Sequence, residues 1–136
     1  MYIPHEKPSA WAHIRGGGVT GFVHFYPTEN GTIVSADIHG LPHSGFFAFH
    51  LHEGGDCTTP GGHYNPTNEP HPAHAGDLPP LLSAGGRAHM TVLTDRFTPA
   101  QIIGKTVVIH AHPDDFRTQP SGDPGEILAC GRVHGA

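Results

Sequence analysis

The chain has 136 residues and a formal net charge of −5, from seven Lys and Arg against twelve Asp and Glu. The sequence contains no basic cluster, which argues against nucleic acid as a partner. No apolar run reaches the length of a membrane-spanning helix, so we expect no membrane partner either. A chain of this length can bury one core but not two, and we therefore expect a single domain over residues 1–136.

Two features of the sequence bear on the cellular compartment. Residues 1–11, MYIPHEKPSAW, have neither a basic start nor an apolar segment, so they do not resemble a secretory signal peptide. We expect either a cytoplasmic protein or the mature form of an exported one. The two cysteines, Cys57 and Cys130, are far apart, which favours one long-range disulfide in an oxidising compartment and free buried thiols in a reducing one.

Taken in chain order, seven β-rich runs alternate with Gly- and Pro-rich segments. These predicted strands are residues 9–14, 19–27, 32–40, 45–52, 87–93, 105–112 and 126–133. The RGGG segment at residues 15–18 is typical of a hairpin turn between the first two strands. No long stretch has apolar residues at helical spacing. The pattern predicts an all-β fold, an antiparallel sandwich or barrel.

Two long segments lack strand character. The longer one, residues 54–86, is a length that inside a compact domain is usually either functional or disordered. The second, residues 116–125, is rich in Pro and Gly and follows shortly after His110. We expect both segments to be functional loops.

The histidines form an ordered set around the longer loop. Because the chain has 14 histidines, a single His-x-His pair carries little information by itself. His50 and His52 lie in an apolar run that we interpret as a strand, where the period of two places both imidazoles on one face. Further donors follow at His63, His71, His74, Asp77 and His110. Neutral nitrogen donors together with a carboxylate indicate a metal site, and this number of donors indicates two metals.

Five motifs in sequence order, FAFHLHEGGDC, GGHYNP, HAGDLP, VVIHAHPDD and LACG, resemble the copper/zinc superoxide dismutase family over nearly the whole chain. The resemblance implies a Greek-key β-barrel with the metal loops on one side. It also implies a disulfide between Cys57 and Cys130, and it leaves a homodimer open. The implied copper ligands are His50, His52, His63 and His110, and the implied zinc ligands are His63, His71, His74 and Asp77, so that His63 is shared.

The donor chemistry agrees with that division. Three imidazoles and one carboxylate suit a structural Zn²⁺ ion. Four imidazoles without a thiolate suit copper, which alternates between Cu²⁺ and Cu⁺, whereas zinc has no redox chemistry. The resemblance implies that copper disproportionates superoxide to O₂ and H₂O₂. It further implies that His63 exchanges copper for a proton during the cycle, which makes His63 both a ligand and a catalytic proton donor.

Two residues near His110 receive separate predictions. Asp114 resembles the family aspartate that hydrogen-bonds one copper-ligand and one zinc-ligand histidine, and such a carboxylate fixes imidazole tautomers. Its alternative is a turn role in the sequence Pro-Asp-Asp. Strand alternation would place His112 on the same face as His110, as an accessory residue of the site, although we favour a structural or solvated role for it.

One position departs from the family pattern. The family has an arginine three residues before its second cysteine, which attracts superoxide, and this chain has Ile127 there. An apolar side chain supplies neither charge nor hydrogen-bond donors. Arg117 and Arg132 are the candidates to supply charge from elsewhere. The segment between His71 and His74 is also shorter than in most members of the family. The alternative to an enzyme is a zinc- or copper-binding protein on the same fold with lost or weak dismutase activity.

Overall fold

The structure is a computed structural model, and it describes residues 7–136. Within these residues seven strands form one antiparallel sheet in the order β5-β8-β9-β1-β2-β3-β7, and β4 pairs with β6 in a second, small sheet. No helix of this part of the chain is long and apolar enough to cross a membrane. The elements are β1 (Ala10–Gly16), β2 (Val19–Thr28), β3 (Gly31–His39), β4 (Gly45–Phe47), β5 (Phe49–His52), β6 (Leu81–Ser83), β7 (Ala88–Thr94), α1 (Pro99–Ile102), β8 (Thr106–His110) and β9 (Ile127–Gly135).

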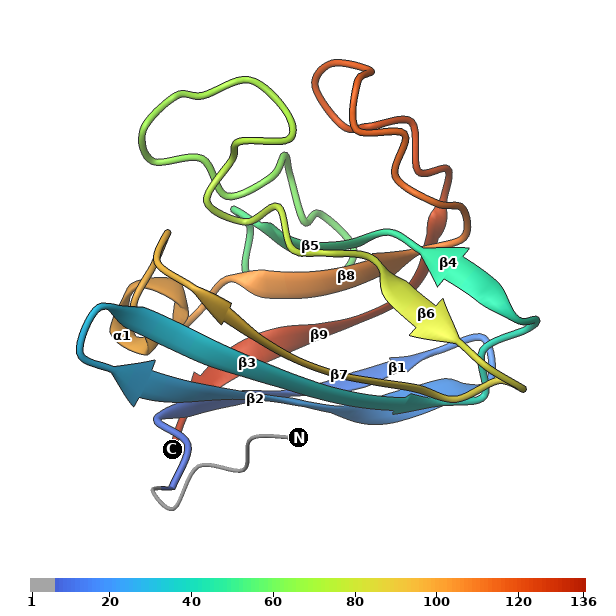
Figure 1. Ribbon diagram of the computed structural model, residues 1–136, viewed down its shortest axis with the longest axis horizontal. Coiled ribbons are helices and arrows are strands. Elements are labelled where there is room, and N and C mark those ends of the chain that lie inside the picture. The colour runs from blue at the N-terminus through green and yellow to red at the C-terminus, as the bar shows by residue number, and fades with distance from the viewer. Residues whose placement is uncertain (1–6) are drawn as a thin grey trace.

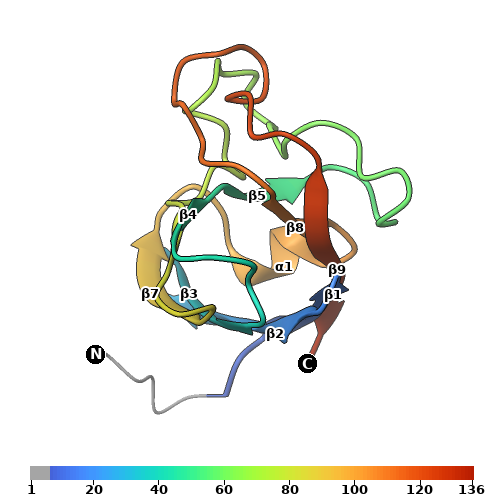
Figure 2. The same ribbon diagram turned by 90° about the vertical axis from the view of Figure 1, so that its right-hand side faces the viewer.

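The large sheet curls around an apolar interior, and β4 and β6 lie across its opening (Figures 1 and 2). Alternate residues of the strands point inward. In β2, Val23 and Phe25 are fully buried, whereas Phe22, which directly precedes Val23, is 44% exposed. Phe47 and Phe49 are fully buried in the interior, facing β2 from the other side of the barrel. Ala48 lies between them, where the chain passes from the small sheet to the large one. The prediction of an all-β antiparallel Greek-key barrel is confirmed.

Most of the predicted strands agree with the structure to within a few residues. The turn predicted between the first two strands is present: Gly17 and Gly18 join β1 to β2 with φ of +53° and +84°. Positive φ at both turn residues is a feature of one of the two common two-residue hairpin turns, and glycine adopts it without steric cost. The predicted strand over residues 45–52 is divided into β4 and β5, and β6 and α1 were not predicted.

The strand predicted over residues 105–112 is too long. Its alternation predicted that His112 lies on the same face as His110, and this prediction is wrong. The strand β8 ends at His110, and the register with β9 shifts between Ile109 and His110. The His112 side chain is exposed and packs over Gly125. Its backbone N–H donates to the carbonyl of Pro124 at 2.9 Å instead of continuing the ladder.

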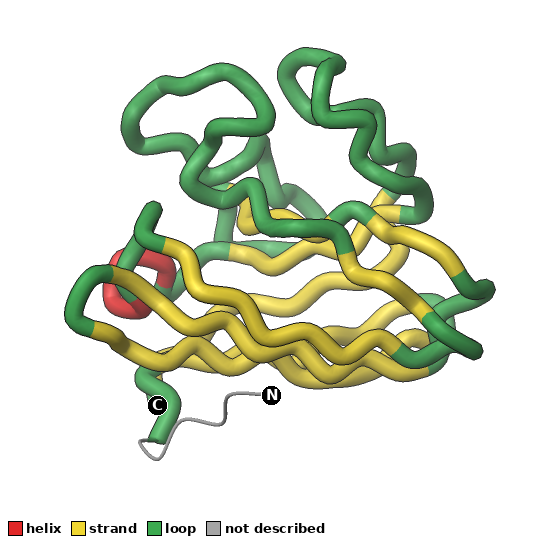
Figure 3. Tube along the Cα trace, viewed as in Figure 1, coloured by secondary structure: helices red, strands yellow, loops and turns green. Residues whose placement is uncertain are grey.

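Two long loops rise from the same side of the barrel, above β5 and β8 (Figures 1 and 3). The first loop, residues 53–80, joins β5 to β6, and the second loop, residues 111–126, joins β8 to β9. A disulfide between Cys57 and Cys130 ties the first loop to β9, with a Cα–Cα distance of 6.0 Å. The predicted disulfide is therefore confirmed, and the free-thiol alternative is excluded.

Candidate metal centre

The first loop is seated on β5 through the backbone of Leu51, the residue between the two β5 histidines. The Leu51 N–H donates to the Gly76 carbonyl at 2.9 Å, and the Leu51 carbonyl accepts the Tyr64 N–H at 2.8 Å. A Cβ at Gly76 would lie 2.4 Å from the Leu51 oxygen, so this approach requires glycine. The same contact places two loop residues in β-bridges with β5: His63 opposite His52, and Asp77 opposite His50.

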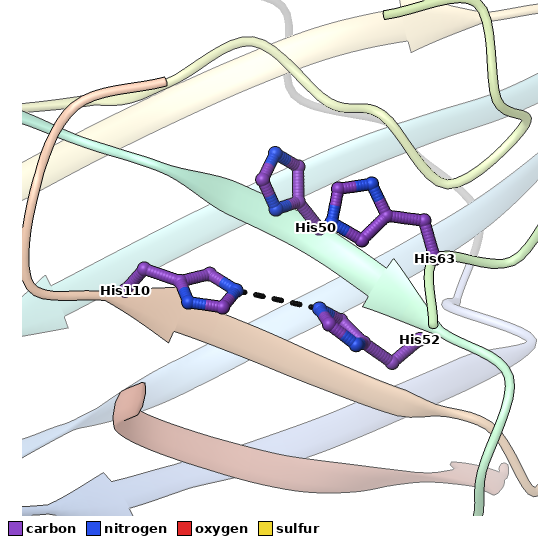
Figure 4. Close-up of side chains that lie close together, drawn as sticks. All are labelled: His50, His52, His63 and His110. Atoms are coloured by element: carbon purple, nitrogen blue, oxygen red, sulfur yellow. Dashed lines mark hydrogen bonds between the residues drawn. The ribbon is translucent and has the colours of Figure 1, made fainter. Parts of the chain in front are cut away.

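Four imidazoles meet above the barrel, and we call them the four-histidine group: His50, His52, His63 and His110. Figure 4 shows that β5 supplies two of them, β8 supplies one and the first loop supplies the fourth. One ring nitrogen from each lies within 4.8 Å of the others. The strands β5 and β8 are hydrogen-bonded neighbours, so the barrel itself positions three of the four rings.

The hydrogen bonds of two rings determine which nitrogen is free. The Nδ1–H of His52 donates to the Gly61 carbonyl at 2.7 Å, and the Nδ1–H of His110 donates to the Gly125 carbonyl at 3.1 Å. Because a carbonyl can only accept, both neutral rings carry their lone pair on Nε2. These two Nε2 atoms lie 3.3 Å apart (Figure 4). Two lone pairs directed at the same point are the arrangement that a cation stabilises.

The other two rings of the group direct free nitrogens into the same space. The Nε2–H of His50 donates to Asp114 at 2.8 Å, which leaves a lone pair on Nδ1. His50 Nδ1 and His63 Nε2 are both buried, and neither has a hydrogen-bond partner. Orphaned polar atoms of this kind are rare inside proteins and call for an explanation such as a bound ion. The donor set therefore fits a metal ion bound by four imidazoles.

Burial favours the neutral form of the three strand-borne imidazoles. Burial, together with the charge interaction with His63, lowers the pKa of His50 to about 3 and the pKa of His52 to about 4. Burial also lowers the pKa of His110. A neutral ring is the form that binds metal, so burial prepares His50, His52 and His110 to bind a cation at neutral pH.

A second donor group, the zinc-type group, consists of His63, His71, His74 and Asp77. His63 Nδ1 lies 2.8 Å from Asp77 Oδ1 and 3.1 Å from His74 Nδ1. Asp77 Oδ2 lies 3.1 Å from both His71 Nδ1 and His74 Nδ1. Four donors placed tetrahedrally at metal distances of about 2.0–2.1 Å are separated by roughly 3.3 Å, so this spacing fits Zn²⁺ despite the short segment between His71 and His74.

Asp77 is the only carboxylate of the zinc-type group, and its side chain is 4% exposed. Burial raises its pKa, but the hydrogen bond from His63 and the neighbouring imidazoles outweigh burial, so the net pKa lies below the ordinary value. Asp77 is thus ionised at neutral pH. The group therefore offers three nitrogens and one negative oxygen, and it shares His63 with the four-histidine group.

Asp114 connects the two donor groups through hydrogen bonds to one histidine of each. Its two carboxylate oxygens accept from His50 Nε2 at 2.8 Å and from His71 Nε2 at 2.7 Å. Burial raises the pKa of Asp114, but these hydrogen bonds and one from the Phe116 N–H outweigh it, and the net pKa is lowered. The contact leaves Nδ1 of each ring free for a metal, which is the tautomer-fixing role expected of a carboxylate here.

A cavity of about 260 Å³ opens beside the four-histidine group. Among the described residues that line it there is no Lys or Arg. Ile127 is paired with His110 across β8 and β9 and is 41% exposed. Arg132 lies beside Gly55 and Gly104, and Arg117 is an exposed residue whose backbone N–H donates to Asp115. The lining of the cavity is His52, Gly61, Gly62, His63, Asn65, His74, His110, Pro120 and Ser121.

Two further residues contact the zinc-type group, and no sequence pattern indicated them. Arg96 follows β7, and its Nη1 donates to the carbonyls of Pro72 at 3.1 Å and of His74 at 3.0 Å. Gln119 belongs to the second loop and hydrogen-bonds the backbone of His71. Both side chains act on main-chain atoms, and such contacts leave no motif in a sequence.

A Greek-key β-barrel in which β5, β8 and the first loop bring together two histidine-rich donor groups defines a class of metal-binding β proteins. Residues 19–133 match the family described as "Copper/zinc superoxide dismutase (SODC)". The chain belongs to this family.

Individual relatives agree with the family match. A superoxide dismutase [Cu-Zn] of Deinococcus radiodurans is 34% identical over 142 residues, covering 85% of this chain and 77% of the relative. Superoxide dismutase [Cu-Zn] 3 of Arabidopsis thaliana is 33% identical and covers 98% of this chain and 94% of the relative. Among solved structures, the clock protein EA4 is similar with a TM-score of 0.84 and 29% identity, covering all of both chains.

Proposed function

We propose that this protein is a copper/zinc superoxide dismutase that converts two superoxide anions and two protons into O₂ and H₂O₂. The observation that carries the proposal is the convergence of four imidazole nitrogens beside an open cavity, with one of the rings shared by a second donor group. Copper would be held by His50 Nδ1 and by Nε2 of the other three: His52, His63 and His110. Zinc would be held by Nδ1 of His63, His71 and His74 and by the Asp77 carboxylate.

Bound copper supplies reversible one-electron exchange, which zinc cannot supply. The chain supplies the rest. Asp114 fixes the tautomers of His50 and His71, and burial lowers the pKa of His50 so that this ring is unprotonated at neutral pH. His63 has its Nε2 on the cavity side and its Nδ1 on the zinc side, so Nε2 can hold a proton beside the substrate while Nδ1 stays in place. That position suits a proton donor to the peroxide product.

A second candidate function is metal binding with weak or no dismutase activity. The observation in its favour is the neutral lining of the cavity, with Ile127 where the family has an arginine. A fixed cation near the metal would attract the anionic substrate, and without one the rate of encounter falls. The complete four-histidine group argues for the enzyme, because a chain that had abandoned redox chemistry would have no need of a copper-type site.

The test compares His50→Ala with His63→Ala in protein loaded with both metals. His50 belongs to one donor group, so its loss should remove copper and leave zinc. His63 belongs to both groups, so its loss should disturb both metals. Elemental analysis and a superoxide disproportionation assay are run on the same samples. Wild-type protein that holds only zinc and shows no dismutation would contradict the proposal and support the metal-binding alternative.

A further inference from the structure

The side-chain amide of Gln119 forms a double hydrogen bond with the backbone of His71. The His71 N–H donates to Gln119 Oε1 at 2.8 Å, and Gln119 Nε2 donates to the His71 carbonyl at 2.7 Å. Gln119 Nε2 also donates to the Arg117 carbonyl at 3.2 Å, which fixes the amide within its own loop. One amide thereby pairs with both polar groups of a single residue, as a neighbouring strand would.

Through this pair the second loop holds His71 at three points. The third is the hydrogen bond between His71 Nε2 and Asp114, which belongs to the same loop. The His71 side chain is fully buried and directs Nδ1 toward Asp77 in the zinc-type group. His71 is therefore the residue at which the two loops meet, and its backbone and side chain are positioned by different residues of the second loop.

The residues directly after Gln119 form part of the wall of the cavity. Pro120 and Ser121 line it together with three rings of the four-histidine group. Two backbone hydrogen bonds make this stretch a tight unit: Gly122 N–H to the Thr118 carbonyl at 2.7 Å, and Asp115 N–H to the Gly122 carbonyl at 2.9 Å. A shift of Gln119 would consequently shift the wall.

We propose that Gln119 is a positioning residue that ties the wall of the copper cavity to the zinc-type group, so that zinc binding orders residues 117–122. The inference rests on the proposed function only in assigning zinc to the group that contains His71. The coupling is reciprocal: if zinc orders the wall, an ordered wall strengthens zinc binding by the same factor. Loss of both hydrogen bonds should weaken zinc binding roughly tenfold, which corresponds to about 1.4 kcal/mol.

The experiment uses copper-free protein with and without Zn²⁺ and measures amide hydrogen exchange in both loops together with the zinc dissociation constant. Gln119→Met keeps the length of the side chain and removes both hydrogen bonds. Gln101→Met is the matched control, because Gln101 Oε1 also accepts a backbone N–H, that of Thr98 at 2.8 Å, beside α1 and away from the site. Any general loss of stability appears in both variants.

In wild-type protein and in Gln101→Met, zinc should slow exchange in both loops. In Gln119→Met, zinc should slow exchange in the first loop while residues 117–122 keep their metal-free rate, and the dissociation constant should rise about tenfold. Equal protection and equal affinity in Gln119→Met and wild type would overturn the inference. Wild-type protein that binds no zinc would overturn the proposed function instead. If Gln119→Met does not fold, Gln119→Asn serves, since its amide is one methylene too short for both contacts.

Discussion

The two donor groups are built in different ways, although they share His63. Three of the four rings of the four-histidine group stand on the paired strands β5 and β8, whose positions are set by the barrel. Every member of the zinc-type group comes from the first loop. A group on a sheet is held by the same packing that folds the protein. A group on a loop has to be held by separate contacts, because loops bury little apolar surface.

Those separate contacts can be identified. The first loop is tied to β5 by the backbone of Leu51, to β9 by the Cys57–Cys130 disulfide, to the end of β7 by Arg96 and to the second loop by Gln119. Each contact is local, and each can be removed without touching a donor atom. The comparison therefore predicts that strand-held and loop-held donors respond to different perturbations.

Acid should act most strongly on the strand-held rings. Their pKa values in the folded protein are lowered, to about 3 for His50 and about 4 for His52, and in the same direction for His110. In the unfolded chain these rings take up protons near pH 6.5, so the unfolded state binds more protons than the folded state between that pH and the folded pKa values. Their contribution to stability is complete above about pH 6.5 and is lost as the pH falls, by about 1.4 kcal/mol per pH unit for each of His50 and His52 and in the same direction for His110.

Denaturant unfolding of metal-free protein from pH 7.5 to 4.5 checks this slope. The matched variant is His50→Gln, which removes one of the three rings and should make the slope shallower by about one proton. A flat profile between pH 6.5 and 4.5 in wild-type protein would contradict the prediction.

Loss of the disulfide should act on the loop-held group. The bridge closes a loop of 73 residues, and in the chain-entropy model a loop of this size contributes about 4 kcal/mol. The double variant Cys57→Ser with Cys130→Ser should lose about that much stability without metals, and its zinc affinity should fall more than its copper affinity. Metal titrations and denaturant unfolding give both numbers. A reductant should have no effect on the variant, and equal losses for the two metals would refute the contrast.

A cation introduced at Ile127 should raise the rate of dismutation. Ile127 of β9 is paired with His110 of the neighbouring strand β8 and is partly exposed. An arginine at this position can therefore reach the cavity, whose described lining has no Lys or Arg. We expect about a tenfold increase in kcat/KM at low salt, fading as ionic strength approaches 0.15 M, where the Debye length is about 8 Å. Ile127→Gln is the uncharged control and should show neither effect. An Ile127→Arg rate equal to that of wild type would mean that another basic residue already attracts the substrate.

Arg96 should have the smallest effect, confined to the loop. Its guanidinium donates to the carbonyls of Pro72 and His74, at the short segment between His71 and His74. Arg96→Gln should weaken zinc binding about fivefold, which corresponds to about 1 kcal/mol, and leave copper binding unchanged. Arg87→Gln is the control, because the Arg87 side chain forms an exposed ion pair with Asp37 at 3.5 Å, away from the site. Zinc competition with a chelator measures the difference.

The sequence predicted the strands well where alternation ran for five residues or more. It missed β6 because three residues after Pro79 and Pro80 are too few to show a period. It missed α1 although Thr98, Pro99 and Gln101 form a capping box with proline at the first helical position. A helix of four residues has no apolar stripe to accompany that signal.

For the site, the ordered motifs predicted which residues come together, and the structure brings them together. What the sequence could not provide lies in the backbone. The shift in register at His110 and the end of β8 there place His112 outside the site, with its N–H donating to the Pro124 carbonyl. Gln119 and Arg96 bind carbonyl and amide groups that every residue possesses, so their partners can be identified only in three dimensions.

The contact between Leu51 and the first loop has a consequence for self-association. The strand β5 is the last strand of the seven-stranded sheet, and beyond it the sheet would end in unpaired backbone groups. Gly76 and Tyr64 cover that edge by occupying both polar groups of Leu51. An uncovered edge is a template on which another chain can add a strand. The loop that carries the zinc-type group therefore also blocks strand addition at this edge. If the loop leaves β5 in zinc-free protein, light scattering should detect an association that zinc-loaded protein does not show.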